Sequence, residues 1–78
     1  MGVAAVDANK LESLRRAAQE ICDRYRAGIR VDVASVEIGR YLVILKAPKS
    51  AWNAVTLGNA AREIEALEGV ERVTAEAD

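Results

Sequence analysis

Two lysines and a serine stand close together where an apolar segment ends: Lys46, Lys49 and Ser50, with Pro48 between them. The pattern predicts a helix with Ser50 as its N-cap, and the free backbone N–H groups of a helix N-terminus favour an anion. A phosphate or a phospholipid headgroup could therefore bind there. The alternative is an ordinary N-cap beside two solvated lysines, because no glycine-rich phosphate loop accompanies them.

A second candidate site is the pair Trp52 and Val55, three residues apart in the same expected helix. Helical spacing places both on the outer side, away from the apolar stripe. An exposed tryptophan beside a valine is typical of a protein-interface anchor. The alternative is that Trp52 folds back over the end of the preceding strand.

The residue types argue against catalysis and against a metal. The chain has no histidine, the commonest general base and metal ligand, and a single cysteine, Cys22. Cys22 lies on an expected apolar helix stripe, so we interpret it as an inert core thiol. We interpret the acidic residues as a solvated helix face, since no facing carboxylate can be placed beside them: Glu63, Glu65, Glu68 and Glu71. The sequence predicts no enzyme, no cofactor and no metal.

The amino-acid composition limits the classes of partner that we expect. The 78 residues suit one domain, and the net charge is −1 with acidic and basic residues mixed. We expect no nucleic-acid binding, because that rests on concentrated positive charge. There is no apolar run of membrane-spanning length and no signal-peptide pattern. We therefore expect a cytoplasmic protein, or an envelope-associated one if the chain is a fragment of a larger secreted protein.

The first expected element is a helix that begins at Asn9 and stops at Gly28. Asn9 is a favourable N-cap, and Glu12 completes a capping-box pattern. An apolar stripe follows at helical spacing: Leu11, Leu14, Ala18, Ile21, Cys22 and Tyr25. Residues 1–8 are predicted to be an N-terminal tail, and residues 9–78 the single domain. The alternative is a short strand at residues 3–6.

Two strands are expected next, over residues 29–38 and 41–47, meeting at Gly39. The apolar positions of the first strand change parity near Ala34 and Ser35, which predicts a β-bulge there. The second strand is apolar on both parities: Tyr41, Val43 and Leu45 on one side, Leu42 and Ile44 on the other. A strand of this kind is central or covered on both faces, so one of these sets is a candidate self-association surface.

A second helix over residues 51–68 and a strand over residues 71–77 complete the pattern. Two strands joined by a helix should run parallel in a right-handed crossover. The sequence therefore predicts an α+β fold: an αββαβ two-layer sandwich, with a three-stranded mixed sheet and two helices on one face. If residues 3–6 form a strand, the alternative is a ferredoxin-like βαββαβ fold.

The second half of the chain resembles the BON domain, a small αββαβ module of bacterial envelope proteins. The resemblance rests on five segments: residues 35–39, 41–45, 48–50, 60–64 and 67–73. The last of these carries Gly69-Val70 and Val73, a pattern that ferredoxin-like regulatory domains share. Lys46-Ala47 stands where the BON pattern usually has a glycine. The resemblance implies a non-enzymatic role in binding membranes or partner proteins.

Together these features predict a non-catalytic interaction or oligomerisation module. Self-association or contact with another protein would use Tyr41, Val43 and Leu45, or else Leu42 and Ile44, with Trp52 and Val55 as the second surface. The alternative function is a ligand-sensing regulatory domain that binds a small anion or a phospholipid headgroup near Lys46, Lys49 and Ser50. Contact with a membrane surface fits that alternative.

Overall fold

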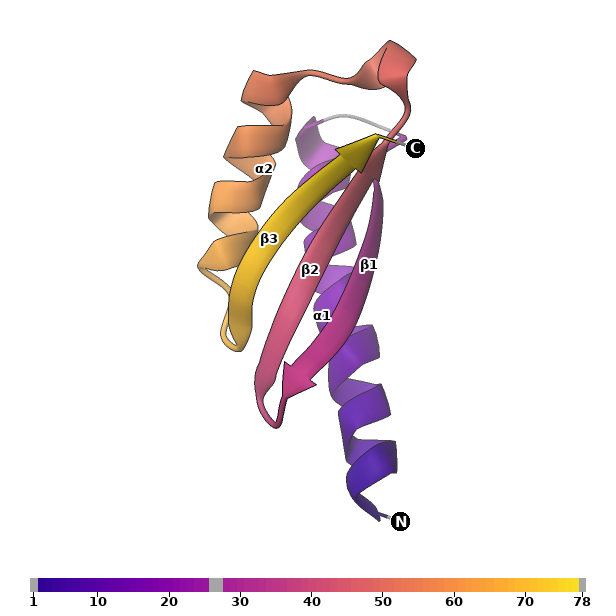
Figure 1. Ribbon diagram of the computed structural model, residues 1–78, viewed down its shortest axis with the longest axis vertical. Coiled ribbons are helices and arrows are strands. Elements are labelled where there is room, and N and C mark those ends of the chain that lie inside the picture. Colours follow the sequence, from indigo (N-terminus) through magenta and orange to yellow (C-terminus); the bar gives the residue numbers. More distant parts are fainter. Residues whose placement is uncertain (1, 26–27, 78) are drawn as a thin grey trace.

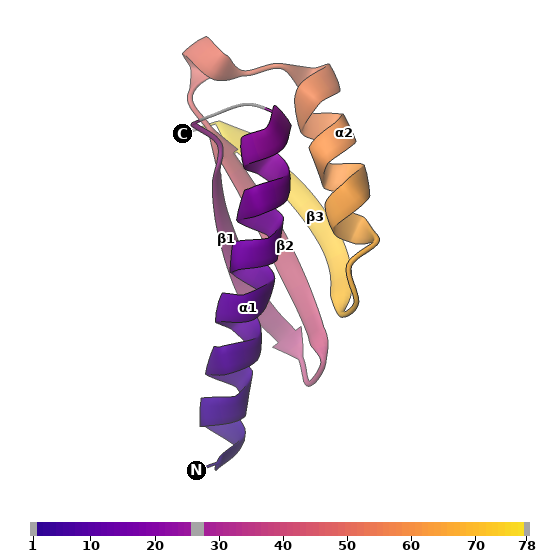
Figure 2. The same cartoon turned by 180° about the vertical axis from the view of Figure 1, so that it is seen from behind.

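The computed structural model describes residues 2–25 and 28–77 of the chain. The elements follow in the order α1 (Gly2–Tyr25), β1 (Arg30–Glu37), β2 (Arg40–Ala47), a short 3-10 helix η1 (Lys49–Ala51), α2 (Ala54–Glu65) and β3 (Val70–Ala77). Both helices cover the same face of the sheet, and the other face carries no further layer of the described chain (Figures 1 and 2). The predicted αββαβ arrangement of the α+β class is confirmed.

The central strand of the sheet is β2, in the order β1-β2-β3. It pairs antiparallel with β1, where Val31 lies opposite Leu45, and parallel with β3, where Val43 lies beside Val73. The parallel pair requires the chain to cross over the sheet, and α2 makes this crossing. The three-stranded mixed sheet therefore joins a hairpin of neighbouring strands to a strand that is distant in sequence.

The hydrophobic core fills the space between the two layers. Alternation along β2 turns its odd-numbered side chains toward the helices, and they meet one apolar stripe from each helix. The buried residues are Leu14, Ala18, Ile21, Cys22, Ile29, Val31, Tyr41, Val43, Leu45, Ala47, Leu57, Ala60 and Ile64. The predicted stripe of α1 agrees with this core except for Tyr25, which is more exposed, and Leu11, which is partly buried.

Helix α1 starts earlier than the sequence predicts. Residues 2–8 are helical, so neither the N-cap at Asn9 nor a strand at residues 3–6 is found. The physical reason is propensity: this stretch contains several alanines and no proline, so nothing interrupts the helix before Asn9. A capping signal inside such a run does not start a helix. The added turns extend past the hairpin end of the sheet (Figure 1).

Helix α2 starts later than predicted. Lys49–Ala51 form the 3-10 turn η1 instead, and the N-cap of α2 is Asn53, whose side-chain oxygen accepts a hydrogen bond from the Thr56 N–H at 3.0 Å. Ser50 is therefore not the cap. Asparagine outranks most residues as an N-cap because its short side chain reaches the first free N–H groups. The helix also ends at Glu65, three residues before the predicted end.

The hairpin contains the predicted bulge, slightly displaced. The register between β1 and β2 shifts between Ser35 and Glu37, so Val36 has no opposite residue. This shift explains the change of parity in the sequence, but it does not bury the residues that follow it. Val36 is 51% exposed and Ile38 86% exposed.

Candidate functional site

The open face of the sheet is the first candidate surface. Strand alternation directs Leu42 and Ile44 of β2 to this face, where both are only half-buried. Their neighbours across the strands are Ala34 and Arg72 beside Leu42, and Asp32 and Thr74 beside Ile44. The result is an apolar centre within a largely polar surround, on a face that the helices leave uncovered (Figure 1).

The alternative set of β2 residues lies inside the molecule. Tyr41 is 2% exposed, and Val43 and Leu45 are fully buried beneath the two helices. These three side chains form the centre of the core, so they are not available for contact with another molecule while the chain is folded. Of the two sets that the sequence leaves open, Leu42 and Ile44 are on the accessible side.

Trp52 and Val55 lie at the end of the molecule where η1 leads into α2. Trp52 follows the 3-10 turn, its N–H donates to the Lys49 carbonyl at 3.2 Å, and its side chain is 43% exposed. Val55 is in the first turn of α2 and is 73% exposed. Both side chains are accessible, but Trp52 lies just outside the helix, so helical spacing accounts only for Val55.

The three residues of the predicted anion site are not arranged around a helix N-terminus. Lys46 extends from β2, where its Nζ lies 2.9 Å from the Asp32 carboxylate. This hydrogen bond raises the pKa of Lys46 and lowers that of Asp32. Lys49 and Ser50 are exposed in η1, and Asn53 caps the start of α2. The expected helix end is therefore displaced from the two lysines.

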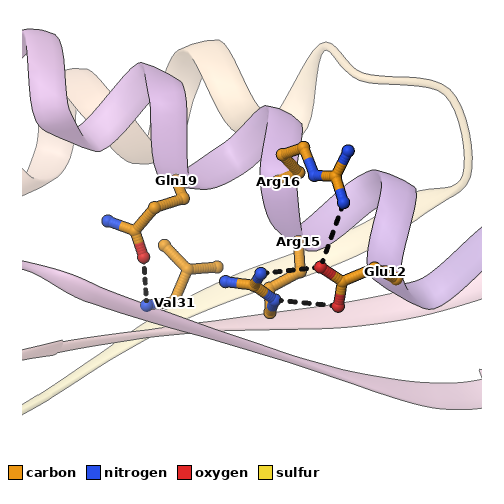
Figure 3. Close-up of polar contacts among 5 residues, drawn as sticks. All are labelled: Glu12, Arg15, Arg16, Gln19 and Val31. Atoms are coloured by element: carbon orange, nitrogen blue, oxygen red, sulfur yellow. Dashed lines mark hydrogen bonds and ion pairs between the residues drawn. The ribbon is translucent and has the colours of Figure 1, made fainter.

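A hollow of about 250 Å³ lies elsewhere beside Lys46, at the outer edge of β1. It is lined by Arg15, Gln19, Arg30, Val31, Asp32 and Lys46. Arg15 also holds Glu12 through two hydrogen bonds, the shorter at 2.7 Å, and this contact lowers the pKa of Glu12 (Figure 3). The sequence did not predict this grouping, because α1 and β1 bring together residues that no motif connects.

Gln19 is a second feature that sequence reasoning missed. Its side-chain Nε2 donates to the Ile29 carbonyl at 2.7 Å. Its Oε1 accepts from the Val31 N–H at 3.2 Å, as Figure 3 shows. The carboxamide thus occupies backbone groups on the free edge of β1. A weak signal was present in the sequence: Gln19 is a polar residue at the border of an otherwise apolar stripe.

The remaining reactive groups have structural surroundings. Cys22 is fully buried, and this burial raises the pKa of its thiol to about 11. Glu63 accepts hydrogen bonds from Tyr25 and from Arg24, so it joins α2 to α1, and its hydrogen bond raises the pKa of Tyr25. Within residues 2–25 and 28–77, no group of three or more His, Cys, Asp or Glu side chains is placed to hold a metal ion.

No helix in the described part of the chain is long and apolar enough to cross a membrane. Comparison with protein-family models, with curated proteins and with solved structures gave no match.

Proposed function

We propose that this chain is a non-catalytic interaction module that associates with other copies of itself through its β-sheet. The observation that carries the proposal is the open face, where Leu42 and Ile44 stand on the central strand with no layer of the described chain above them. A partner that covered these two side chains would remove apolar surface from water, which is favourable. Self-association also suits a small domain, whose own core is limited.

The solution mass tests this proposal. Size exclusion coupled to light scattering, from micromolar to millimolar protein, should show a dimer or larger species that forms with increasing concentration. A strict monomer throughout that range overturns the proposal.

Two variants then test which surface of the protein makes the contact between copies. Leu42→Gln with Ile44→Thr removes apolar area from the open face, and Val55→Glu introduces a charge on the outer side of α2. Loss of association only in Val55→Glu would assign the contact to the surface of Trp52 and Val55, which contradicts a sheet contact. Association that survives Val55→Glu supports the sheet.

A second candidate function, a ligand-sensing domain that binds a small anion, has one specific observation in its favour. The hollow at the β1 edge is lined by Arg15, Arg30 and Lys46, of which Arg15 pairs with Glu12 and Lys46 pairs with Asp32. Inorganic phosphate should then raise the melting temperature more than chloride at equal ionic strength. Lys46→Gln should abolish the difference, whereas Lys49→Gln, outside the hollow, should keep it. Equal melting temperatures in both salts contradict anion binding.

A further inference from the structure

The two outer edges of the sheet differ in how they are protected. On β1, Gln19 occupies the Ile29 carbonyl and the Val31 N–H, two of the groups that an added strand would use. On β3, none of the described residues pairs with the outer edge, although the strand runs eight residues. Proteins usually block long edge strands, because unpaired backbone groups recruit another strand. β1 is therefore blocked only at its start, whereas no backbone group on the outer edge of β3 has a partner among the described residues.

The backbone groups on that edge can be identified by alternation. The Tyr41 N–H donates to the Gly69 carbonyl at 2.8 Å, so the odd-numbered residues of β2 direct their hydrogen bonds toward β3. In a parallel ladder, the residue directly beside such a position directs its own groups the other way. Val73 lies beside Val43, and Ala75 lies beside Leu45. Val73 and Ala75 therefore present their N–H and C=O groups to the open edge.

The sequence of β3 is complementary to itself in one antiparallel register. If Thr74 of one copy lies opposite Thr74 of another, Arg72 faces Glu76 and Val73 faces Ala75, twice across the pair. Arg72 and Glu76 share the open face of the sheet and are exposed. Glu76 lies beside Lys46 of β2, and no ion pair within 4 Å among the described residues involves Arg72 or Glu76. A register centred on Arg72 or on Glu76 would instead place like charges opposite each other, which destabilises strand pairing.

Helix α2 is compatible with this arrangement. It lies beside β3 on the side away from β1 (Figure 1), so pairing two β3 strands brings two α2 helices close together. Glu63 contacts α1, and helical spacing places Ala54, Gly58, Ala61 and Glu65 on the opposite side of α2. The small residues Ala54 and Gly58 allow a close approach of two helices near the start of α2, and the exposed Glu65 lies at its end. A Cβ added at Gly58 would meet no atom of its own chain, so the fold of one copy does not require a glycine there.

We propose that the edge of β3 is the self-association site, where two copies pair their β3 strands antiparallel about a twofold axis at Thr74 and form one six-stranded sheet. We assign a second copy to the edge because only that register places Arg72 of each copy opposite Glu76 of the other. This inference rests on the self-association proposed above, and it places the contact at the β3 edge, so the open face of Leu42 and Ile44 stays uncovered in the pair. A twofold contact uses the same edge of both copies, so it closes at two copies and leaves the β1 strands at the two outer ends of the sheet.

Charge reversal with rescue tests the register. Arg72→Glu and Glu76→Arg each replace two opposite-charge pairs by like-charge pairs, so each should raise the dimer dissociation constant about tenfold. The double variant restores opposite charges and should return to within roughly threefold of the wild type. Dissociation constants would be measured by sedimentation at low salt.

Cross-linking provides a second measurement, independent of stability changes. In a Cys22→Ala background, Thr74→Cys places two thiols at a non-hydrogen-bonded pair, roughly 4.5 Å apart between Cα atoms, within disulfide reach. Oxidised glutathione should convert it to a covalent dimer. Ala34→Cys, exposed on the same face but on β1, should stay largely monomeric under the same oxidation.

The outcomes separate the two proposals. A wild-type dimer whose affinity is unchanged by both charge reversals, or that fails to cross-link through Thr74→Cys, overturns the β3 register and leaves self-association intact. A wild-type monomer at every concentration overturns both. Weaker dimers in both single charge-reversal variants, with the affinity restored in the double variant, support both proposals.

Discussion

The Gln19 side chain is hydrogen-bonded to the Val31 backbone N–H, and the same carboxamide donates to the Ile29 carbonyl two residues earlier in the chain. The carboxamide thus acts as one peptide unit of a neighbouring strand. It fastens α1 to the edge of β1 by polar contacts, in addition to the apolar contacts beneath. One side chain therefore both holds two elements together and blocks strand addition at the start of that edge.

Replacing Gln19 by leucine should lower the free energy of unfolding by about 1–3 kcal/mol, because partly buried backbone groups lose their partner. Urea denaturation measures this change. Glu20→Leu is the matched control: Glu20 is exposed in the next position of α1 and has no hydrogen bond or ion pair among the described residues. Equal destabilisation by the two substitutions would contradict a specific role for the carboxamide.

Replacing Asn53 by alanine should destabilise the protein by about 1 kcal/mol, because the Thr56 N–H loses its cap. Ser50→Ala is the control, since Ser50 is the cap that the sequence pattern favours but is exposed in η1. We expect its effect to stay within about 0.5 kcal/mol. Thermal unfolding of both variants decides between the two capping residues, and a larger effect at Ser50 would reverse the assignment.

Gly69 and Gly39 both have positive φ angles, 92° and 78°, so alanine is strained at either position. They differ in their surroundings. A Cβ at Gly69 would lie 3.3 Å from the buried Tyr41 ring and 3.4 Å from the Gly39 carbonyl oxygen, whereas a Cβ at Gly39 meets nothing. We expect Gly39→Ala to cost about 1 kcal/mol and Gly69→Ala clearly more. Urea unfolding of the two variants side by side would show the difference, and equal losses would mean that the Tyr41 contact is unimportant.

The buried thiol of Cys22 should make stability fall in alkali. Burial raises its pKa from the ordinary value of 9.0 to about 11, so above pH 9.0 the unfolded chain loses this proton while the folded chain keeps it. Stability is therefore complete below pH 9.0 and declines toward pH 11, by about 1 kcal/mol between pH 9 and 10. Urea unfolding of the wild type and of Cys22→Ala at pH 7, 9 and 10 isolates this slope as the difference between the two profiles, because the raised pKa values of Tyr25 and Lys46 act in both proteins. The same dependence of stability on pH in both proteins would rule out Cys22 as the cause of the decline.

The sequence predicted the order of the elements well because long apolar patterns determine it. The alternation of Tyr41, Val43 and Leu45 and the stripe from Leu14 to Cys22 are both strong signals, and both form the core. Element ends were less predictable. Ser50 and Asn53 are both favourable N-cap residues. The choice between them depends on the path of the chain after β2, through Pro48 and the 3-10 turn, and that path is set by tertiary structure.

The candidate surfaces could be predicted only in part. The pattern of β2 showed that two apolar sets exist, but the sequence could not say which set the helices cover, because either parity fits a central strand. The contacts Gln19–Ile29 and Lys46–Asp32 join residues from different elements at spacings that no motif encodes. Such pairs follow from the packing of α1 on β1 and from strand register, and become visible only in three dimensions.

The parallel pair of β2 and β3 also affects how the chain folds. β2 finds β1 across a short turn, but Tyr41 pairs with Val70, so β3 joins only after α2 has crossed the sheet. Contacts between distant residues form slowly because a long loop must close first. During synthesis, the most apolar strand of the protein therefore emerges with one edge unpaired. The last eight-residue strand closes that edge, and until it docks the nascent hairpin is the part of this chain most prone to aggregation.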